Sequence, residues 1–157
     1  MSGSGSYNAV TWLLDRNVDE GRGDKLAFTD TVSELTYVAL QKQSRRLANL
    51  LRRLGVHREQ RVAMIMLDTV DFPIVFLGAM RAGVVPVPLN TLLTADQYAY
   101  VLADCRARVL FISEALLPVV KAMVGRMPDL EHVVVSGHDA HGHKKLADEI
   151  ARESDAF

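Results

Sequence analysis

The stretch Arg61-Val-Ala-Met-Ile-Met-Leu67 decides the fold class of this 157-residue chain. After Arg61 it runs to Leu67 without a polar side chain, which predicts a strand buried on both faces. Such a strand is typical of a parallel sheet with helices on both sides, because neither face of that sheet meets water. The stretch therefore predicts an α/β protein.

Helices and strands alternate after this stretch. A helix is predicted from about Thr69 to Ala82, with Asp68 or Thr69 as its amino-terminal cap. The further predicted elements are a strand over 84–89, a helix from the capping box at Thr94 to Asp104, a strand over 108–112, a helix over 114–127, a strand over 131–135 and a helix over 144–153. This alternation is the signature of βαβ units with right-handed crossovers. We therefore expect a mostly parallel sheet flanked by helices.

Two prolines set one of these strands apart. Pro86 and Pro88 both fall within the strand predicted over 84–89. Because proline has no N–H to donate to a neighbouring strand, this strand is predicted at an edge of the sheet or as an irregular strand.

The segment before Arg61 is expected to contain a leader, a short helix and a hairpin. Residues 1–6, Met-Ser-Gly-Ser-Gly-Ser, are expected to be a flexible leader, and the folded part to span 7–157. A short helix is predicted over 9–18, and two short strands over 25–29 and 33–35 predict a hairpin ahead of the parallel sheet.

A long amphipathic helix is predicted between the hairpin and Arg61. Thr36 is its expected cap and Gly55 its expected end. Its apolar side carries Leu40, Leu47, Leu51 and Leu54 at helical spacing. Its polar side carries five basic residues, Lys42, Arg45, Arg46, Arg52 and Arg53. We interpret the basic residues as a solvated helix face.

Composition narrows the class of protein. The net charge is −1 and 49% of the residues are hydrophobic, so the sequence has no electrostatic footprint for nucleic acid or for an anionic membrane. Apolar stretches are broken by Asp, Arg, Gly or Pro, and the chain shows no secretory signal. Cys105 is the only cysteine. We expect a cytoplasmic protein that binds neither nucleic acid nor membrane, with Cys105 as a small buried residue.

Familiar catalytic motifs are absent from the sequence. No strand is followed by Gly-x-Gly-x-x-Gly, and the sequence contains neither a P-loop nor a Gly-x-Ser-x-Gly elbow. We therefore assign no catalytic residue. Because open α/β sheets usually bind ligands at the carboxyl ends of their strands, the candidates for a binding site are Asp68 and Thr69, Asn90 and Thr91, Ser113 and Glu114, and Ser136 with Gly137. His138-Asp-Ala-His-Gly-His143 brings together three imidazoles and a carboxylate, but its spacing matches no standard zinc motif. We interpret it as an exposed polar loop rather than a metal site.

Four phrases together resemble the adenylate-forming superfamily of acyl-CoA ligases, luciferases and peptide-synthetase adenylation domains. Leu35-Thr-Tyr-Val-Ala-Leu40 resembles the first core motif, with Ala39 where the family usually has Glu. Phe76-Leu-Gly-Ala-Met-Arg-Ala-Gly-Val-Val-Pro-Val-Pro-Leu89 resembles the second. Leu67-Asp-Thr-Val-Asp-Phe-Pro73 and Leu89-Asn-Thr-Leu-Leu-Thr-Ala-Asp-Gln-Tyr98 look most like benzoate-CoA and 4-hydroxybenzoate-CoA ligases.

This resemblance implies an ATP-dependent aryl-CoA ligase. In that family an aromatic carboxylate and ATP form an aryl adenylate and diphosphate with Mg²⁺, and CoA then displaces AMP. The phosphate loop, the aryl pocket and the catalytic lysine lie later in the family's chain. Residues 7–157 would therefore be part of the large N-terminal domain, an incomplete and inactive piece that binds no cofactor alone and whose partner is the missing remainder of its own chain.

The same resemblance places two residues near CoA. The loop after the Pro-x-Pro strand approaches the CoA nucleotide in related ligases, which makes Asn90 and Thr91 candidate neighbours of CoA. Leu92 stands where some members have Arg, so a charged phosphate contact is not expected there. Asn90 and Thr91 are equally accounted for as turn and capping residues.

The alternative is a self-contained α/β binding or dimerisation module without catalytic activity. A receiver-like domain needs clustered acids at strand ends, and Asp68 alone meets that description. Strands built to be covered on both faces also predict an apolar patch where further strands belong, which favours a homo-oligomer.

Overall fold

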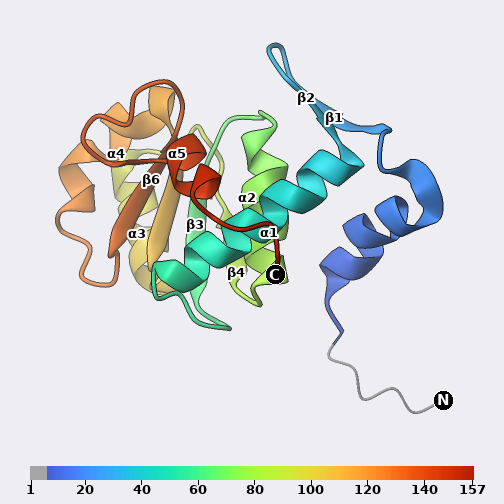
Figure 1. The fold of residues 1–157 in the computed structure, drawn as a ribbon. Coiled ribbons are helices and arrows are strands. Elements are labelled where there is room, and N and C mark those ends of the chain that lie inside the picture. Colours follow the sequence, from blue (N-terminus) through green and yellow to red (C-terminus); the bar gives the residue numbers. More distant parts are fainter. Residues whose placement is uncertain (1–6) are drawn as a thin grey trace.

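The computed structural model describes residues 7–157, and the leader predicted over 1–6 lies outside the described residues. The chain forms a five-stranded parallel sheet and a separate antiparallel hairpin (Figure 1). The sheet has the order β4-β3-β5-β6-β7. The strands are β3 (Arg61–Ile65), β4 (Val85–Pro88), β5 (Val109–Ser113), β6 (His132–Ser136) and β7 (Lys144–Lys145). The predicted α/β class, with a mostly parallel sheet and a preceding hairpin, is confirmed.

The burial of β3 explains its apolar sequence. Val62 and Met64 have no exposed surface and belong to one hydrophobic cluster. Ala63 and Ile65 are equally buried but belong to a second cluster. Successive side chains of a strand point to opposite faces, so each face of β3 supports its own layer of core. Because β3 also pairs with a strand on each side, its residues from Val62 to Ile65 are buried and leave no place for a polar side chain, whereas Arg61 at its start is exposed.

Helices cover both faces of the sheet. The first cluster includes Leu47, Ile74 and Ile150, which come from three helices, whereas the second includes Tyr98 and Val120 from two others. The first layer is made by α1 (Tyr37–Arg53), α2 (Asp71–Arg81) and α5 (Leu146–Ala151), and the second by α3 (Ala95–Cys105) and α4 (Leu117–Val124). None of the helices in the described part of the chain has both the length and the apolar character needed to cross a membrane.

The helices α1 and α2 approach each other closely where they cross. A Cβ atom added at Gly78 would lie 2.5 Å from Leu47 Cδ2 and 3.0 Å from the carbonyl oxygen of Ser44. Real Cβ atoms do not approach other atoms so closely, because packed interiors leave no spare volume. Gly78 therefore sets the distance between the two helices that cover the first face of the sheet.

The prolines of β4 cost the sheet no hydrogen bonds. The N–H groups of Val85 and Leu89 donate to the carbonyl oxygens of Gln60 (2.8 Å) and Met64 (2.9 Å), on the side of β3. Because backbone groups alternate along a strand, the nitrogens of Pro86 and Pro88 lie on the opposite, open side. β4 is the outermost strand of the sheet, so the predicted edge position is confirmed. The prolines remove donors that would otherwise invite another strand to pair there.

The amino-terminal segment is fastened to the helices by a largely buried ion pair. Two π-helical turns, Thr11–Asp15 and Val18–Arg22, stand where a short helix was predicted. Arg81 donates from Nη2 to Asp15 Oδ1 (2.7 Å) and from Nη1 to Oδ2 (3.0 Å), and Gln41 donates to Oδ1 (2.9 Å). Burial alone raises the pKa of Asp15, but the hydrogen bonds from Arg81 and Gln41 outweigh it and hold the pKa below its ordinary value.

The hairpin, which is distant in sequence, supplies the residue that caps the amino-terminal end of α2. It consists of β1 (Leu26–Thr29) and β2 (Glu34–Thr36), with Asp30 in the turn. The prediction that Asp68 or Thr69 caps the helix is wrong, because α2 begins at Asp71 and the residue at its cap position is Val70, whose side chain caps nothing. The N–H of Val70 instead donates to Asp30 Oδ2 at 2.9 Å. A carboxylate there also complements the positive end of the helix dipole.

The other predicted helices are present, but two of them start differently from the prediction. Thr94 and Gln97 form the predicted capping box at the start of α3. The helix predicted over 114–127 starts as a 3-10 turn (Glu114–Leu116) and becomes α4 only at Leu117, with proline in its first turn. The helix predicted from Lys144 is wrong at its start, because Lys144 and Lys145 extend the sheet beside Val134 and Val135.

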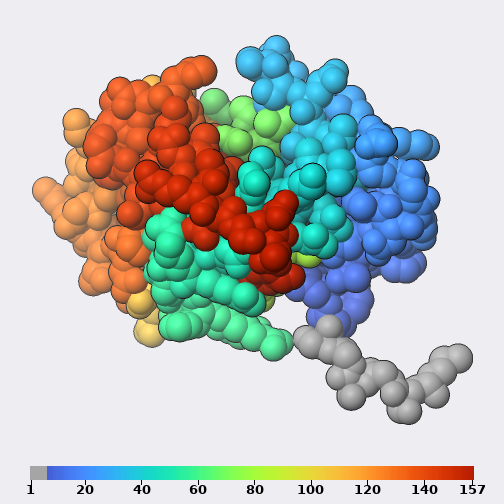
Figure 2. All heavy atoms as spheres, viewed as in Figure 1, coloured from blue at the N-terminus to red at the C-terminus, as the bar shows by residue number. Residues whose placement is uncertain are grey.

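The basic side of α1 is only partly solvated, which corrects the prediction for two of its residues. Arg53 pairs with Glu149 (2.6 Å) and Glu153 (2.5 Å), and the Arg52 guanidinium lies 3.8 Å from the centre of the Phe157 ring. Figure 2 shows the carboxyl-terminal segment lying against α1. Arg52 and Arg53 therefore hold residues 149–157 against α1.

Candidate functional site

All strands of a parallel sheet end at the same edge, and ligands of open α/β proteins bind outside the carboxyl ends of strands. A crevice of about 760 Å³ lies at this edge. It is bounded by the ends of β3, β5 and β6, the start of α2 and the hairpin turn, and its polar lining includes Asp30, Thr69, Asp71, Ser113, Glu114, Ser136, His138 and His141. The crevice is the candidate site.

The hydroxyl groups of two serines in the crevice form hydrogen bonds with other residues of the protein. Ser113, at the end of β5, accepts a hydrogen bond at Oγ from the N–H of Leu67 (2.9 Å). Ser136, at the end of β6, donates from Oγ to Asp71 Oδ2 (2.6 Å). Ser113 and Ser136 are 5% and 8% exposed, so each hydroxyl ties neighbouring elements together instead of presenting a reactive group.

Glu114 organises the loop that follows β6. Its Oε2 accepts hydrogen bonds from the N–H groups of His138 (2.7 Å) and Asp139 (3.1 Å), and its Oε1 lies 3.3 Å from His141 Nε2. The N–H groups of Asp139 and His138 lower the pKa of Glu114 below its ordinary value, because they stabilise the charged form. Gly137 makes this approach possible, since a Cβ there would lie 2.5 Å from Glu114 Cβ.

Asp30 plays the same part in the hairpin turn. Its Oδ1 accepts from the N–H groups of Val32 (2.8 Å) and Ser33 (2.7 Å), while its Oδ2 accepts from Val70. The hydrogen bond from Val70, followed by those from Val32 and Ser33, lowers the pKa of Asp30. The three carboxylates of the crevice, Asp30, Asp71 and Glu114, thus all accept hydrogen bonds from the protein.

Asn90 and Thr91 follow β4 but do not line this crevice. Asn90 is exposed, and its Oδ1 accepts from the N–H of Leu92 (2.8 Å), which makes a local Asx turn. The carbonyl oxygen of Asn90 also accepts from the Tyr98 hydroxyl (2.8 Å), so the turn is anchored to α3. The geometry gives Asn90 a turn role, and its nearness to CoA stays a prediction.

The histidine segment is divided between two hollows. His138 and His141 border the crevice, whereas His143 borders a polar hollow of about 750 Å³ on the other side of the loop. Among residues 7–157 no three His, Cys, Asp or Glu side chains are grouped so as to hold a metal ion. Cys105 is partly buried, and burial raises the pKa of its thiol, which makes it a weak nucleophile at neutral pH.

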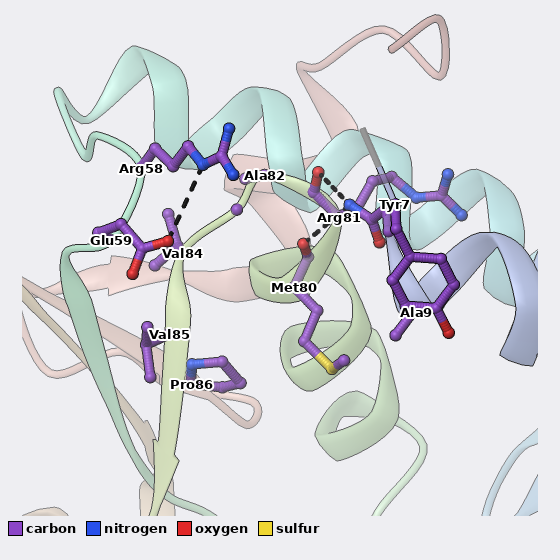
Figure 3. A pocket seen from close by; sticks show the side chains of 12 residues that line it. Tyr7, Ala9, Arg58, Glu59, Met80, Arg81, Ala82, Val84, Val85 and Pro86 are labelled. Carbon is purple, nitrogen blue, oxygen red and sulfur yellow. Dashed lines mark hydrogen bonds and ion pairs between the residues drawn. The ribbon is translucent and has the colours of Figure 1, made fainter. Parts of the chain in front are cut away.

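A further hollow, of about 400 Å³, lies at the opposite edge of the sheet (Figure 3). The Asn8 side-chain amide donates there to the carbonyl oxygens of Met80 (3.1 Å) and Arg81 (3.2 Å), the last turn of α2. Arg58 and Glu59 face one another across 3.9 Å but are 75% and 79% exposed. This hollow lies at the amino ends of the strands, so we assign it a structural role.

Sequence reasoning missed several residues of the crevice. Asp30 lies between the two strands of the predicted hairpin, 25–29 and 33–35, and no role was predicted for it; the partners of Asp71 and Glu114 were not predicted either. Asp30 acts on a residue 40 positions away, and no local pattern carries that information. Ser113, Glu114 and Ser136 were predicted as candidates because each ends or follows a buried strand, and all three line the crevice.

The chain has an open α/β fold, in which helices cover both faces of a parallel sheet. Its crevice lies at the carboxyl ends of the strands, where proteins of this class bind their ligands. Comparison with known protein families identifies the family to which the chain belongs. The sequence profile described as AMP-binding enzyme matches residues 14–156, and the chain belongs to this family.

The most similar curated relatives include aryl-CoA ligases. The chain is 47% identical over 149 residues to the 4-hydroxybenzoate–CoA/benzoate–CoA ligase of Rhodopseudomonas palustris, covering 95% of this chain and 28% of that protein. It is 43% identical over 152 residues to the benzoate–CoA ligase of Thauera aromatica, covering 96% and 28%. The chain thus spans little more than a quarter of the length of these relatives.

Solved structures agree with this family. The benzoate CoA ligase from Burkholderia xenovorans LB400 superposes with a TM-score of 0.86 at 37% identity, over 95% of this chain and 29% of that one. The anthranilate CoA ligase AuaEII in complex with anthranoyl-AMP superposes with a TM-score of 0.90 at 34% identity, over 96% and 28%. The resemblance deduced from the sequence motifs is confirmed.

Proposed function

We propose that residues 7–157 are the amino-terminal part of an ATP-dependent aryl-CoA ligase, which joins benzoate or a hydroxybenzoate to CoA with release of AMP and diphosphate. The observation that carries this proposal is the 47% identity to the 4-hydroxybenzoate–CoA/benzoate–CoA ligase across 95% of the chain. Relatives that share less identity include ligases of other acids, so the aryl substrate class rests on the more similar ones.

The charge of the crevice supports the view that this part is scaffold. Adenylation needs cationic groups or backbone N–H groups aimed at developing negative charge on phosphate. The crevice instead presents the carboxylates of Asp30, Asp71 and Glu114, and among the residues that the structure describes neither lysine nor arginine lines it. The residues present therefore do not fit the phosphates of ATP or CoA, and no catalytic step is assigned to them. We propose that the chain alone binds neither nucleotide and is inactive.

The role of Asn90 and Thr91 belongs to the same proposal. We expect the turn after β4 to lie near CoA in the complete enzyme, with its shape fixed by the bond from Tyr98 to Asn90. Exposed Leu92, 88% accessible, would then offer an apolar contact rather than a charged one. Self-association is a further expectation, since other large apolar side chains are also exposed.

A chimera tests the proposal. Residues 7–157 replace the aligned segment of the Rhodopseudomonas palustris ligase, and benzoate-dependent ATP–diphosphate exchange is measured for the chimera and for the 157-residue chain alone. We expect exchange by the chimera and none by the chain. The matched control carries the corresponding segment of the Thauera aromatica benzoate–CoA ligase. An active control beside an inactive, folded chimera would refute the proposed family role, and exchange by the chain alone would refute the scaffold role.

A further inference from the structure

The loop between β6 and β7, residues 137–143, stands as a wall between two hollows. Gly137, His138 and His141 line the crevice of about 760 Å³, whereas Gly142 and His143 line the polar hollow of about 750 Å³. His138 borders both. Any outward movement of this loop would therefore join the two spaces into one.

The loop is fastened to the rest of the protein mainly through one side chain. Within the described chain, the hydrogen bonds that join residues 137–143 to another element all end on the Glu114 carboxylate. The other bonds of the loop are internal, from the N–H of His143 to the carbonyl oxygen of Ala140 (2.9 Å) and from the N–H of His141 to Asp139 Oδ1 (2.7 Å). Apart from these bonds, the small side chain of Ala140 packs against the second core cluster.

The ends of the loop are built for a change of backbone direction. Gly137 and Gly142 have φ values of +156° and +86°, which glycine adopts at little cost. Internal bonds keep the segment between them together, and glycines at its ends supply hinge positions of the kind that absorb backbone rotation when a loop opens. The loop therefore has the parts of a hinged wall: two pivots, an internally bonded body and one fastening.

We propose that Glu114 is a latch that holds the 137–143 loop closed as a wall of the crevice, and that loss of this latch opens the loop while the sheet stays folded. The hydrogen-bond partners of the Glu114 carboxylate are His138, Asp139 and His141 on the loop, and the other carboxylates that line the crevice are Asp71 on α2 and Asp30 on the hairpin. Within residues 7–157 neither lysine nor arginine lines the crevice, so no such side chain competes with the loop for the Glu114 carboxylate. The inference concerns local opening and does not depend on the proposed ligase activity.

Amide hydrogen exchange of the 157-residue chain, followed residue by residue by NMR, tests the latch. In Glu114→Ala we expect the amides of His138 and Asp139 to exchange at least about tenfold faster than in the wild type, because their charged acceptor is gone. Amides in the middle of β5 and β6 should keep their rates. Glu114→Gln retains one acceptor oxygen and should give a smaller change.

A matched control removes a carboxylate that, within the described chain, makes no hydrogen bond to the loop. Glu131 pairs with Arg108 at 2.5 Å, before the start of β6, and Glu131→Ala should leave His138 and Asp139 unchanged. Gly137→Ala disturbs the latch from the loop side and should give the same local acceleration as Glu114→Ala. Wild-type exchange rates at these two amides in either latch variant, or acceleration spread evenly through β5 and β6, would overturn the inference.

Discussion

Replacing Gly78 by alanine tests whether the crossing of α1 and α2 depends on the missing side chain. In an ordinary helix this substitution stabilises the protein by about 1 kcal/mol, because alanine loses less backbone entropy than glycine. At Gly78 the new Cβ would lie 2.5 Å from Leu47 Cδ2, 2.7 Å from Leu47 Cβ and 3.0 Å from the carbonyl oxygen of Ser44. We expect the sign of the effect to reverse.

The magnitude follows from which atoms can move. A new rotamer of Leu47 relieves the contact with Cδ2 but not the contact with Cβ, and the Ser44 oxygen belongs to the backbone. Because rotamer changes cannot clear the space, the two helices must separate, which places the strain near the upper end of the ~1–3 kcal/mol that overpacking costs. After the helix-propensity gain of about 1 kcal/mol, the net loss of unfolding free energy should be about 2 kcal/mol.

Urea denaturation followed by circular dichroism measures this loss. Gly125→Ala is the matched control, because Gly125 ends α4 with a φ of −72° and a Cβ there would meet no heavy atom of the described chain within 4 Å. We expect this control to be neutral or stabilised by up to about 1 kcal/mol. Leu47→Ala in the Gly78→Ala background should cost less than in the wild type. A Gly78→Ala protein as stable as the wild type would refute the close-packing argument.

The Asp15–Arg81 ion pair yields two further predictions. Arg81→Ala should lower the unfolding free energy by about 3 kcal/mol, because it leaves the largely buried Asp15 carboxylate without its cation. Arg108→Ala breaks the more exposed pair with Glu131 and should cost under about 1 kcal/mol. Urea denaturation midpoints measure both losses, and equal losses would contradict the argument from burial. The pKa of Asp15 is lower in the folded than in the unfolded chain, so its stabilisation is present above the unfolded pKa and is lost as pH falls through the folded pKa. Asp15→Asn should therefore flatten the fall in stability between about pH 5 and about pH 3, and an unchanged slope would argue against this assignment.

Features that depend on neighbours in the sequence were predictable. The apolar run of β3, the capping box at Thr94 and the edge position of the proline-bearing strand all follow from local chemistry. Each of these patterns has one structural solution, because a strand without polar residues must be buried and proline cannot donate a hydrogen bond. The fold class therefore followed from short segments before any contact was known.

Features that depend on distant contacts were not predictable in the same way. Asp68 and Thr69 have the chemistry of helix caps, yet α2 begins at Asp71 because Asp30 from the hairpin receives the N–H of Val70. Lys144 has the polarity of a helix start, yet it pairs with Val134 as a strand. In both cases a partner brought by the tertiary structure outweighs a local preference of about 1 kcal/mol.

The contact between Glu114 and Gly137 lies between these two cases. No motif links them, but the register of the sheet pairs Ser113 with Ser136, and the next residue of each strand is then forced beside the other. Large side chains pair elsewhere along β5 and β6, but at this point a Cβ on residue 137 would lie 2.5 Å from Glu114 Cβ, and only glycine avoids that contact. Once the order β5-β6 is known, Glu114 and Gly137 are expected to be neighbours, which brings the carboxylate close to the N–H groups of His138 and Asp139. The sequence holds both residues of the latch but not the strand order that brings them together.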